Sequence, residues 1–280
     1  YFSNKFDALG VGHEVLAGVD MSYEEKVVYA ARTPAQGGVT LVKPNTTAGT
    51  SNDGAYIDES LRSFREGNAF DSKGYGIYAQ DLIQIAPSWK VLAGLRYDHM
   101  KGTYDINSVP TTATTPITVA TTYQQKISNW SKRFGVLYQP NPLHSYHFSY
   151  GTSFNTSADT YSYSPQSANT DPESSQNLEL AAKLDSADKH FTTRLALFPS
   201  TKKNERNTDP DTASGRALLS GKRHTAGFEI DVSGRMTDDW EIWGSYTWMP
   251  VARVDAAAPC PATGNCTQAT VGNRVGDRPG

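Results

Sequence analysis

The sequence predicts an all-β fold, an antiparallel transmembrane β-barrel to which this chain contributes about nine to ten strands. Apolar and polar residues alternate over long segments, these segments exceed the usual soluble strand of about five or six residues, and their connections are short and long in turn. Strands of about nine to eleven residues can cross a bilayer at a tilt. Outer-membrane barrels have short periplasmic turns and long extracellular loops, whereas a β-sandwich with Greek-key links has no reason to keep that alternation.

A long β-hairpin over residues 74–100 is the clearest unit. Its strands of about a dozen residues each flank a tight turn at Ala86-Pro87-Ser88, which contains common turn-forming residues. In the second strand, apolar residues occupy one face, and polar residues or glycine occupy the other. The apolar face comprises Trp89, Val91, Ala93, Leu95 and Tyr97, and the opposite face comprises Lys90, Gly94, Arg96 and Asp98.

The other predicted strands show the same period of two, each with an apolar face that suits lipid. They are the end of a strand at 2–6, a strand at 13–23, and hairpins at 132–139 with 145–154, 176–185 with 190–198, and 223–236 with 240–249. Long polar connections are expected at 24–73, 101–131, 155–175 and 199–222, with a loop from 250 to the end.

Composition excludes two classes of protein. The mean hydropathy of -0.53 excludes a bundle of membrane helices, and no run approaches the roughly 18 apolar residues that a spanning helix needs. A barrel remains compatible, because only alternate residues face lipid. The net charge of -3, with 26 Lys and Arg spread along the chain, gives no electrostatic footprint for nucleic acid.

Asp81 is the exception to the alternation. It shares its parity with Ile77, Ala79 and Ile83, which would direct a carboxylate towards lipid in the middle of a strand. Either a bulge reverses the parity between Tyr78 and Asp81, or the upper half of that strand faces inward. The sequence leaves both alternatives open.

Aromatic residues near strand ends are typical of the girdles at the membrane interfaces. The general preference of aromatic side chains for sheets is the alternative, but the positions of Trp89 and Trp240 beside turns favour a girdle. The other members are Tyr97, Tyr146 and Trp248.

Charged residues on the opposite parity are predicted to face the lumen. They could line a conduit or bind an anionic solute, but paired ladders, or contacts that hold an internal domain, are favoured. These residues are Arg96, Asp98, Arg133, Glu179, Lys183, Arg194, Glu229, Asp231 and Arg235.

The predicted loops contain aromatic and cationic residues that could hold a large, aromatic, anionic ligand by stacking and charge. For any single residue, an ordinary solvated loop position is the simpler interpretation. The candidates are Tyr123, Tyr161, Tyr163, Lys202, Lys203 and Arg206.

Cys260 and Cys266 lie close together in a stretch rich in Pro, Gly and Thr, which favours a short loop disulfide in an oxidising compartment over a metal pair. The sequence contains no metal-site spacing of its six histidines, no nucleophile elbow, no phosphate loop and no redox CxxC. We therefore expect no catalytic residues, no metal site and no enzyme activity.

One combination of motifs resembles a known family. Tyr78-Ala79-Gln80-Asp81, then Trp89, then Gly94-Leu95-Arg96-Tyr97-Asp98 is similar to the "YxQD … W … GxRYD" hairpin of TonB-dependent outer-membrane receptors. The similarity is closest to the ferric-siderophore branch, with a leaning towards catecholate-type receptors. Further similar stretches are residues 13–20, 206–209, 220–223 and 227–229.

The resemblance implies energised import across the outer membrane of a Gram-negative bacterium. Such receptors are barrels of about 22 strands with a plugged lumen; their loops capture an iron chelate, and TonB acts on the plug to release it. The implied partners are outer-membrane lipid, a ferric siderophore as cargo, and TonB through a plug and TonB box. No resident cofactor is implied.

The chain begins at Tyr1-Phe2 without a signal peptide and ends within a predicted loop, so residues 1–280 are expected to be a partial barrel domain. The plug, the TonB box and the C-terminal aromatic-ended strand of the family are not found in it. Two alternatives remain: a passive porin-like or adhesin-like barrel, and a soluble, secreted β-rich binding or carbohydrate-active protein.

Overall fold

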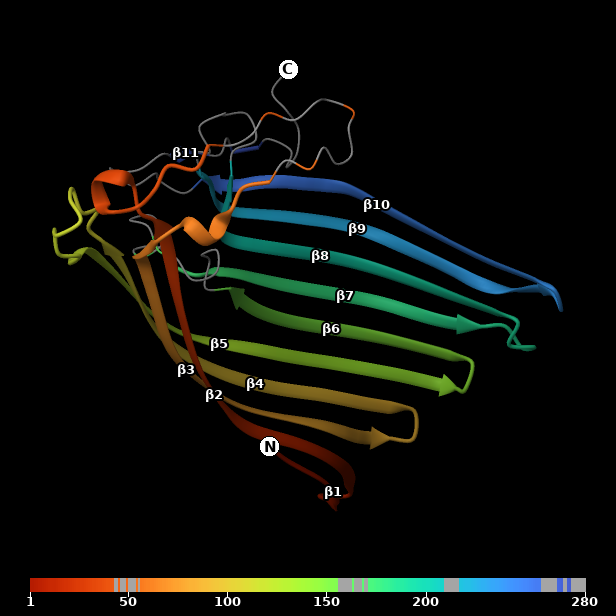
Figure 1. Ribbon diagram of the computed structural model, residues 1–280. Coiled ribbons are helices and arrows are strands. Elements are labelled where there is room, and N and C mark those ends of the chain that lie inside the picture. Colours follow the sequence, from red (N-terminus) through yellow and green to blue (C-terminus); the bar gives the residue numbers. More distant parts are fainter. Residues whose placement is uncertain are drawn as a thin grey trace.

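The computed structural model is one curved sheet in which the first ten strands are antiparallel and each pairs with the next along the chain (Figure 1). It describes residues 1–42, 45, 49, 54, 56–155, 163, 168, 171–208, 217–257, 266–268 and 271–272. The strands are β1 (Phe2–Ala8), β2 (Val11–Ala31), β3 (Phe64–Ala86), β4 (Trp89–Asn107), β5 (Val119–Asn141), β6 (His144–Asn155), β7 (Glu173–Asp185), β8 (Phe191–Thr208), β9 (Ala217–Thr237), β10 (Trp240–Ala257) and β11 (Cys266–Gln268).

The order β1 to β10 confirms the predicted all-β antiparallel fold, and β11 adds a short parallel pairing with β9. The tight turns lie at one end of the sheet, at the right and bottom of Figure 1, and the described parts of the β2–β3 and β4–β5 connections lie at the other. The short 3-10 helices η1 (Pro34–Gln36) and η2 (Glu59–Leu61) belong to the β2–β3 connection. Among the described residues, no helix has the length and apolarity needed to span a membrane.

Several strands extend much further towards the long connections than the sequence predicts. The predicted connections at 24–73, 101–131 and 199–222 are partly wrong, because β2, β3, β4, β5, β8 and β9 continue into them. The loop predicted from 250 is also partly wrong, since β10 runs to Ala257. Outside the bilayer both faces of a strand can be wet, so pairing continues without the apolar alternation that revealed the inner segments.

The two faces of the sheet differ in polarity. The face that carries Val19, Ile77 and Leu95 is apolar, and these side chains are 58%, 53% and 53% exposed in the isolated chain. We call this the outer face, because so large an exposed apolar surface suits lipid. The opposite, inner face carries Arg96 and Asp98.

Asp81 lies on the outer face, and both explanations considered for it are wrong. The pairing of β3 with β2 and β4 has no register shift between Tyr78 and Asp81, so the strand neither bulges nor turns its face there. Instead, His13 Nδ1 lies 2.6 Å from Asp81 Oδ2, and the ring of Phe6 stacks on His13 at 5.2 Å. A polar partner and an aromatic cover therefore accompany the carboxylate on the lipid side.

Two rows of aromatic residues cross the outer face. Trp89 stacks on Tyr138 at 4.4 Å at the short-turn end, and Tyr97 packs against Trp130 at 5.1 Å nearer the long connections. Eight residues of β4 separate the rows, which corresponds to about 26 Å along the strand and about 20 Å of height at a tilt of about 40°. That height approaches the apolar band of about 25 Å between the girdles of outer-membrane barrels.

Candidate functional site

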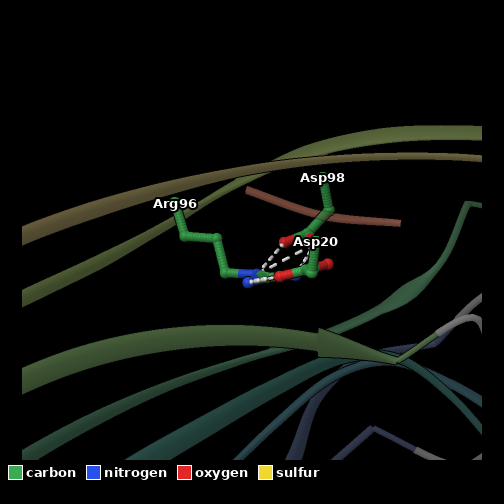
Figure 2. A network of polar contacts seen from close by, with 3 residues as sticks. All are labelled: Asp20, Arg96 and Asp98. Carbon is green, nitrogen blue, oxygen red and sulfur yellow. Dashed lines mark hydrogen bonds and ion pairs between the residues drawn. The ribbon is translucent and has the colours of Figure 1, made fainter. Parts of the chain in front are cut away.

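A three-residue ion network braces the inner face. Asp20 on β2, Gly76 on β3 and Asp98 on β4 form one row across the sheet, and Arg96 lies two residues before Asp98. Figure 2 shows the Arg96 guanidinium joined by dashed lines to both carboxylates. Its Nη1 and Nη2 donate to Asp20 Oδ2 and Oδ1 at 2.6 and 3.0 Å, while its Nε donates to Asp98 at 2.9 Å. The planar fork of arginine suits this double recognition.

Gly76 makes this geometry possible. A Cβ at position 76 would lie 2.7 Å from Arg96 Cζ and 2.7 Å from Asp20 Oδ1, far inside van der Waals contact. The guanidinium therefore crosses β3 directly above a residue without a side chain. The network ties β2 to β4 across the strand between them.

Tyr78 continues the same arrangement in the adjacent row. It stands opposite Gly18 on β2 and Arg96 on β4. A Cβ on Gly18 would lie 2.5 Å from the Tyr78 hydroxyl oxygen, so the phenol lies over that glycine. Arg96 Cζ is 5.6 Å from the Tyr78 ring centroid, within the range of a cation–π contact. The motif residues Tyr78 and Arg96 therefore pack against each other on the inner face of β2 to β4, which we call the inner wall.

A hollow of about 470 Å³ adjoins this wall and has the size of a small-molecule site. Tyr78, Arg96, Arg133 and Asn177 are among its lining residues, and a Cβ on Gly151 would meet nothing within 4 Å. Arg96 is already paired with two carboxylates. Arg133 is exposed and forms no ion pair in the part of the chain that the structure describes. The hollow therefore offers a free cation and hydrogen-bonding groups to an anionic, oxygen-rich partner.

The other residues predicted to face the lumen lie on the same inner face by register. Several of their charges are paired nearby: Glu179 contacts His147 at 2.7 Å, and Lys183 contacts Asp185 at 3.1 Å. Local pairing of this kind limits the net field that the wall presents. The remaining members of this set are Arg194, Glu229, Asp231 and Arg235, the last of which contacts Glu241 at 2.7 Å.

Two of the predicted ligand-binding tyrosines come together at the long-connection end. Tyr163 is 6% exposed and packs edge-on against Phe70 at 5.5 Å, with Tyr104 in the same cluster. Tyr123 lies on β5 rather than in a loop and packs against this cluster. Burial raises the pKa of the Tyr163 hydroxyl, and nearby carboxylates add to that shift. Tyr163 itself lies against the inner face, and its ring is covered.

The predicted lysine pair cannot hold one ligand. Lys202 and Lys203 are consecutive on β8, so their side chains point to opposite faces of the sheet. Lys202 faces inward and contacts Glu173 at 3.4 Å, whereas Lys203 faces outward. Their prediction as loop residues is wrong because β8 extends to Thr208.

Four predicted residues lie wholly or partly outside the described residues. Tyr161 and Cys260 are among the undescribed positions. Arg206 lies on β8 and Cys266 on β11, but only their backbones are described. The ligand and disulfide roles of these residues remain predictions.

Asp20, Gly76 and Tyr78 are the inner-wall residues that the sequence did not mark as a site. The alternation places Asp20 on the polar face of its strand, but Arg96, its ion-pair partner, is 76 positions away in the sequence. Nothing in a single strand shows which partner the sheet will supply. No group of three or more potential metal ligands occurs among the described residues.

Comparisons with known proteins agree with this architecture. The family model "TonB dependent receptor-like, beta-barrel" matches residues 1–280. The "Probable TonB-dependent receptor BfrD" of Bordetella pertussis is 30% identical over 194 residues, covering 67% of this chain and 25% of the relative. The "Catecholate siderophore receptor Fiu" of Escherichia coli K12 is 26% identical over 262 residues, covering 85% of this chain and 32% of the relative. The chain thus spans about a quarter to a third of the length of these curated relatives.

Solved structures show the same fold. The siderophore receptor PiuA from Acinetobacter baumannii superposes with a TM-score of 0.68 at 21% identity, covering 97% of this chain and 40% of that one. The closed form of Fiu from E. coli K12 gives a TM-score of 0.61 at 24% identity, covering 90% and 37%. Family membership locates the chain in the outer membrane of a Gram-negative bacterium. Because the family model matches all of residues 1–280, the chain belongs to the TonB-dependent receptor-like β-barrel family.

Proposed function

We propose that the full-length protein containing this chain is a receptor that imports a ferric siderophore, with TonB supplying the energy. The family match over residues 1–280 is the observation that carries this proposal. Relatives named as siderophore receptors support it, and the name of Fiu favours a catecholate chelate. The iron chelate is the cargo, and the proposal requires no resident cofactor.

The geometry is compatible with capture and passage of a bulky anion. A closed barrel satisfies every backbone group in the hydrocarbon, and long outer connections can cover a ligand. On the inner wall, Arg133 borders the hollow without an ion pair among the described residues. We assign it to an anionic group, either of the passing chelate or of an internal domain that guides it.

Uptake by iron-limited cells tests the proposal. Cells that lack the gene are compared with the same cells carrying the intact gene on a plasmid. Each strain is supplied with a radioiron-labelled catecholate, hydroxamate or citrate chelate. The comparison is repeated in cells that lack TonB. We expect loss of TonB-dependent catecholate uptake and its rescue by the intact gene. Unchanged uptake of every chelate would exclude the siderophore function, and TonB-independent uptake would indicate a passive barrel.

An inner-wall variant connects the structure to that assay. Arg133→Gln is expected to reduce the rate of uptake several-fold, because it removes the free cation beside the hollow. Lys90→Gln is the matched control: Lys90 is also an inner-face cation, but lies next to the short β3–β4 turn, away from the hollow. Equal rates of uptake by the two variants would show that Arg133 does not contribute to passage of the chelate.

A further inference from the structure

The pairing between β5 and β6 stops partway along these two strands, which the structure describes throughout. It ends at Arg133 and Gly151, and Figure 1 shows the strands moving apart towards the long connections. Beyond this point, β5 stays paired with β4 as far as Val119, and β6 stays paired with β7 as far as Asn155. The sheet therefore contains a seam between β5 and β6, which begins beside Arg133 and continues towards the long connections.

Side chains satisfy two backbone donors along this seam. The N–H of Lys132 donates to Thr152 Oγ1 of β6 at 2.9 Å, and the N–H of Trp130 donates to Asn129 Oδ1 at 2.8 Å. An unpaired backbone N–H is costly next to hydrocarbon, so these bonds allow the strands to stay apart in a membrane. They replace carbonyl partners that a continued antiparallel ladder would have supplied. The seam is therefore compatible with a barrel that faces lipid.

The seam crosses the boundary between hydrocarbon and lipid headgroups. Trp130 belongs to the aromatic row nearer the long connections, where it packs against Tyr97. The pairing of β5 with β6 ends three residues away, at Arg133, which lies about 8 Å lower at a strand tilt of about 40°. Just below, Phe134 and Phe148 pack against each other on the apolar outer face, with their ring centroids 6.4 Å apart. A molecule anchored in the outer leaflet therefore meets the seam at the height of its own polar head.

Hollows lie on both sides of the seam. The inner-face hollow of about 470 Å³ reaches it from the lumen side, and a second hollow of about 220 Å³ reaches it from the outer face. Lys132, Thr152 and Ser153 line both of them. Gln176 and Thr201 are among the polar residues that line the outer one, although a barrel surface that faces lipid is normally apolar. The two hollows and the seam together point to a polar passage from the lipid interface to the inner face.

We propose that this seam is a lateral port for a ferric chelate that carries an acyl tail, so that the anionic head reaches Arg133 while the tail stays in the outer leaflet. The inference rests on the siderophore function proposed above and specifies the class of chelate. A tailed chelate that entered from outside the membrane would have to withdraw its tail from lipid, which costs about four-fold in concentration per methylene group. Entry at the height of the headgroups avoids this cost. The polar lining of the passage suits the head and disfavours the tail.

A disulfide across the seam tests the port in the full-length protein. In S131C/S153C the new cysteines would stand opposite each other if the register of Arg133 and Gly151 continued by two residues. In the control G135C/S149C the disulfide joins residues that are already paired on the same face. Iron-limited cells are supplied with a radioiron-labelled catecholate chelate, with or without a dodecanoyl chain, before and after reduction by dithiothreitol. The measured quantity is the ratio of tailed to untailed uptake.

We expect the oxidised S131C/S153C protein to show a ratio about ten-fold below that of its reduced form, because withdrawing even two methylene groups from lipid costs about that much. The control is expected to show the same ratio in both forms. Gly151→Phe should lower the ratio without a disulfide, because a Cβ at position 151 meets no atom within 4 Å and the ring can fill the start of the seam.

The outcomes separate the port from the siderophore function. An unchanged ratio in Gly151→Phe, or in S131C/S153C protein verified as disulfide-linked, would overturn the port. An intact protein that imports only the untailed chelate would overturn it as well. If the intact protein imports neither chelate, the siderophore function itself is rejected together with the port.

Discussion

Replacing Gly76 with alanine tests whether the inner-wall brace stabilises the barrel. The added Cβ would occupy the place of the Arg96 guanidinium, so the contact of Arg96 with Asp20 must break. Arg96 is 36% exposed and Asp20 is 52% exposed, so this pair contributes about 1 kcal/mol. Displacement of the guanidinium also weakens its contact with Asp98, which is 19% exposed. We expect Gly76→Ala to destabilise the folded protein by about 1–2 kcal/mol.

Gly135→Ala is the matched control. Gly135 is also an inner-face strand glycine, but its Cβ would find ordinary contacts at 3.6 Å, so removal of backbone freedom should stabilise by about 0.5 kcal/mol. Urea-induced unfolding of the full-length protein in lipid vesicles, followed by tryptophan fluorescence, measures both. In an Arg96→Ala background the cost of Gly76→Ala should vanish. If Gly76→Ala still destabilised the protein in the Arg96→Ala background, the contacts of Arg96 across Gly76 would not be what stabilises the inner wall.

Three further predictions follow from contacts elsewhere in the chain. His13→Ala should destabilise by about 3 kcal/mol in the same unfolding assay, because Asp81 would face lipid without its partner, and adding Asp81→Ala should recover most of the loss. The pKa of Tyr163 is raised in the folded state, so its neutral phenol contributes fully to stability below about pH 10, and this contribution is lost as pH rises through the folded-state pKa. Tyr163→Phe should reduce the loss of thermal stability at alkaline pH. The Ser186 hydroxyl and a backbone N–H lower the pKa of Asp188 in the β7–β8 turn. The contribution of ionised Asp188 to the stability of the fold is therefore lost as pH falls through that pKa. Ser186→Ala should shift this loss of stability to higher pH in thermal unfolding.

The sequence predicted the membrane-crossing part of the fold because lipid on one face and polar groups on the other impose a period of two. It failed where that asymmetry ends, as at Tyr123 and Lys202, which lie on strands beyond the apolar band. It also failed at Asp81, because the partner that makes an outward carboxylate tolerable comes from another strand, 68 positions away. The two-residue period of apolar and polar positions predicts the environment of each face of a strand. It does not predict which residue of the neighbouring strand lies opposite a given position.

The motif residues show why the sequence identifies the family more readily than the ligand. Tyr78, Arg96 and Asp98 contact Gly18, Gly76 and Asp20 on the inner wall, and these contacts depend on the geometry of three adjacent strands. Any receptor that keeps this wall needs them, whatever chelate it imports. Ligand choice therefore rests with residues that the brace does not constrain, such as Arg133 at the hollow and the long connections. Exchanging those residues between receptors should change the imported chelate without loss of the fold, whereas replacing Gly76 or Arg96 should lower the stability of the fold without changing which chelate is imported.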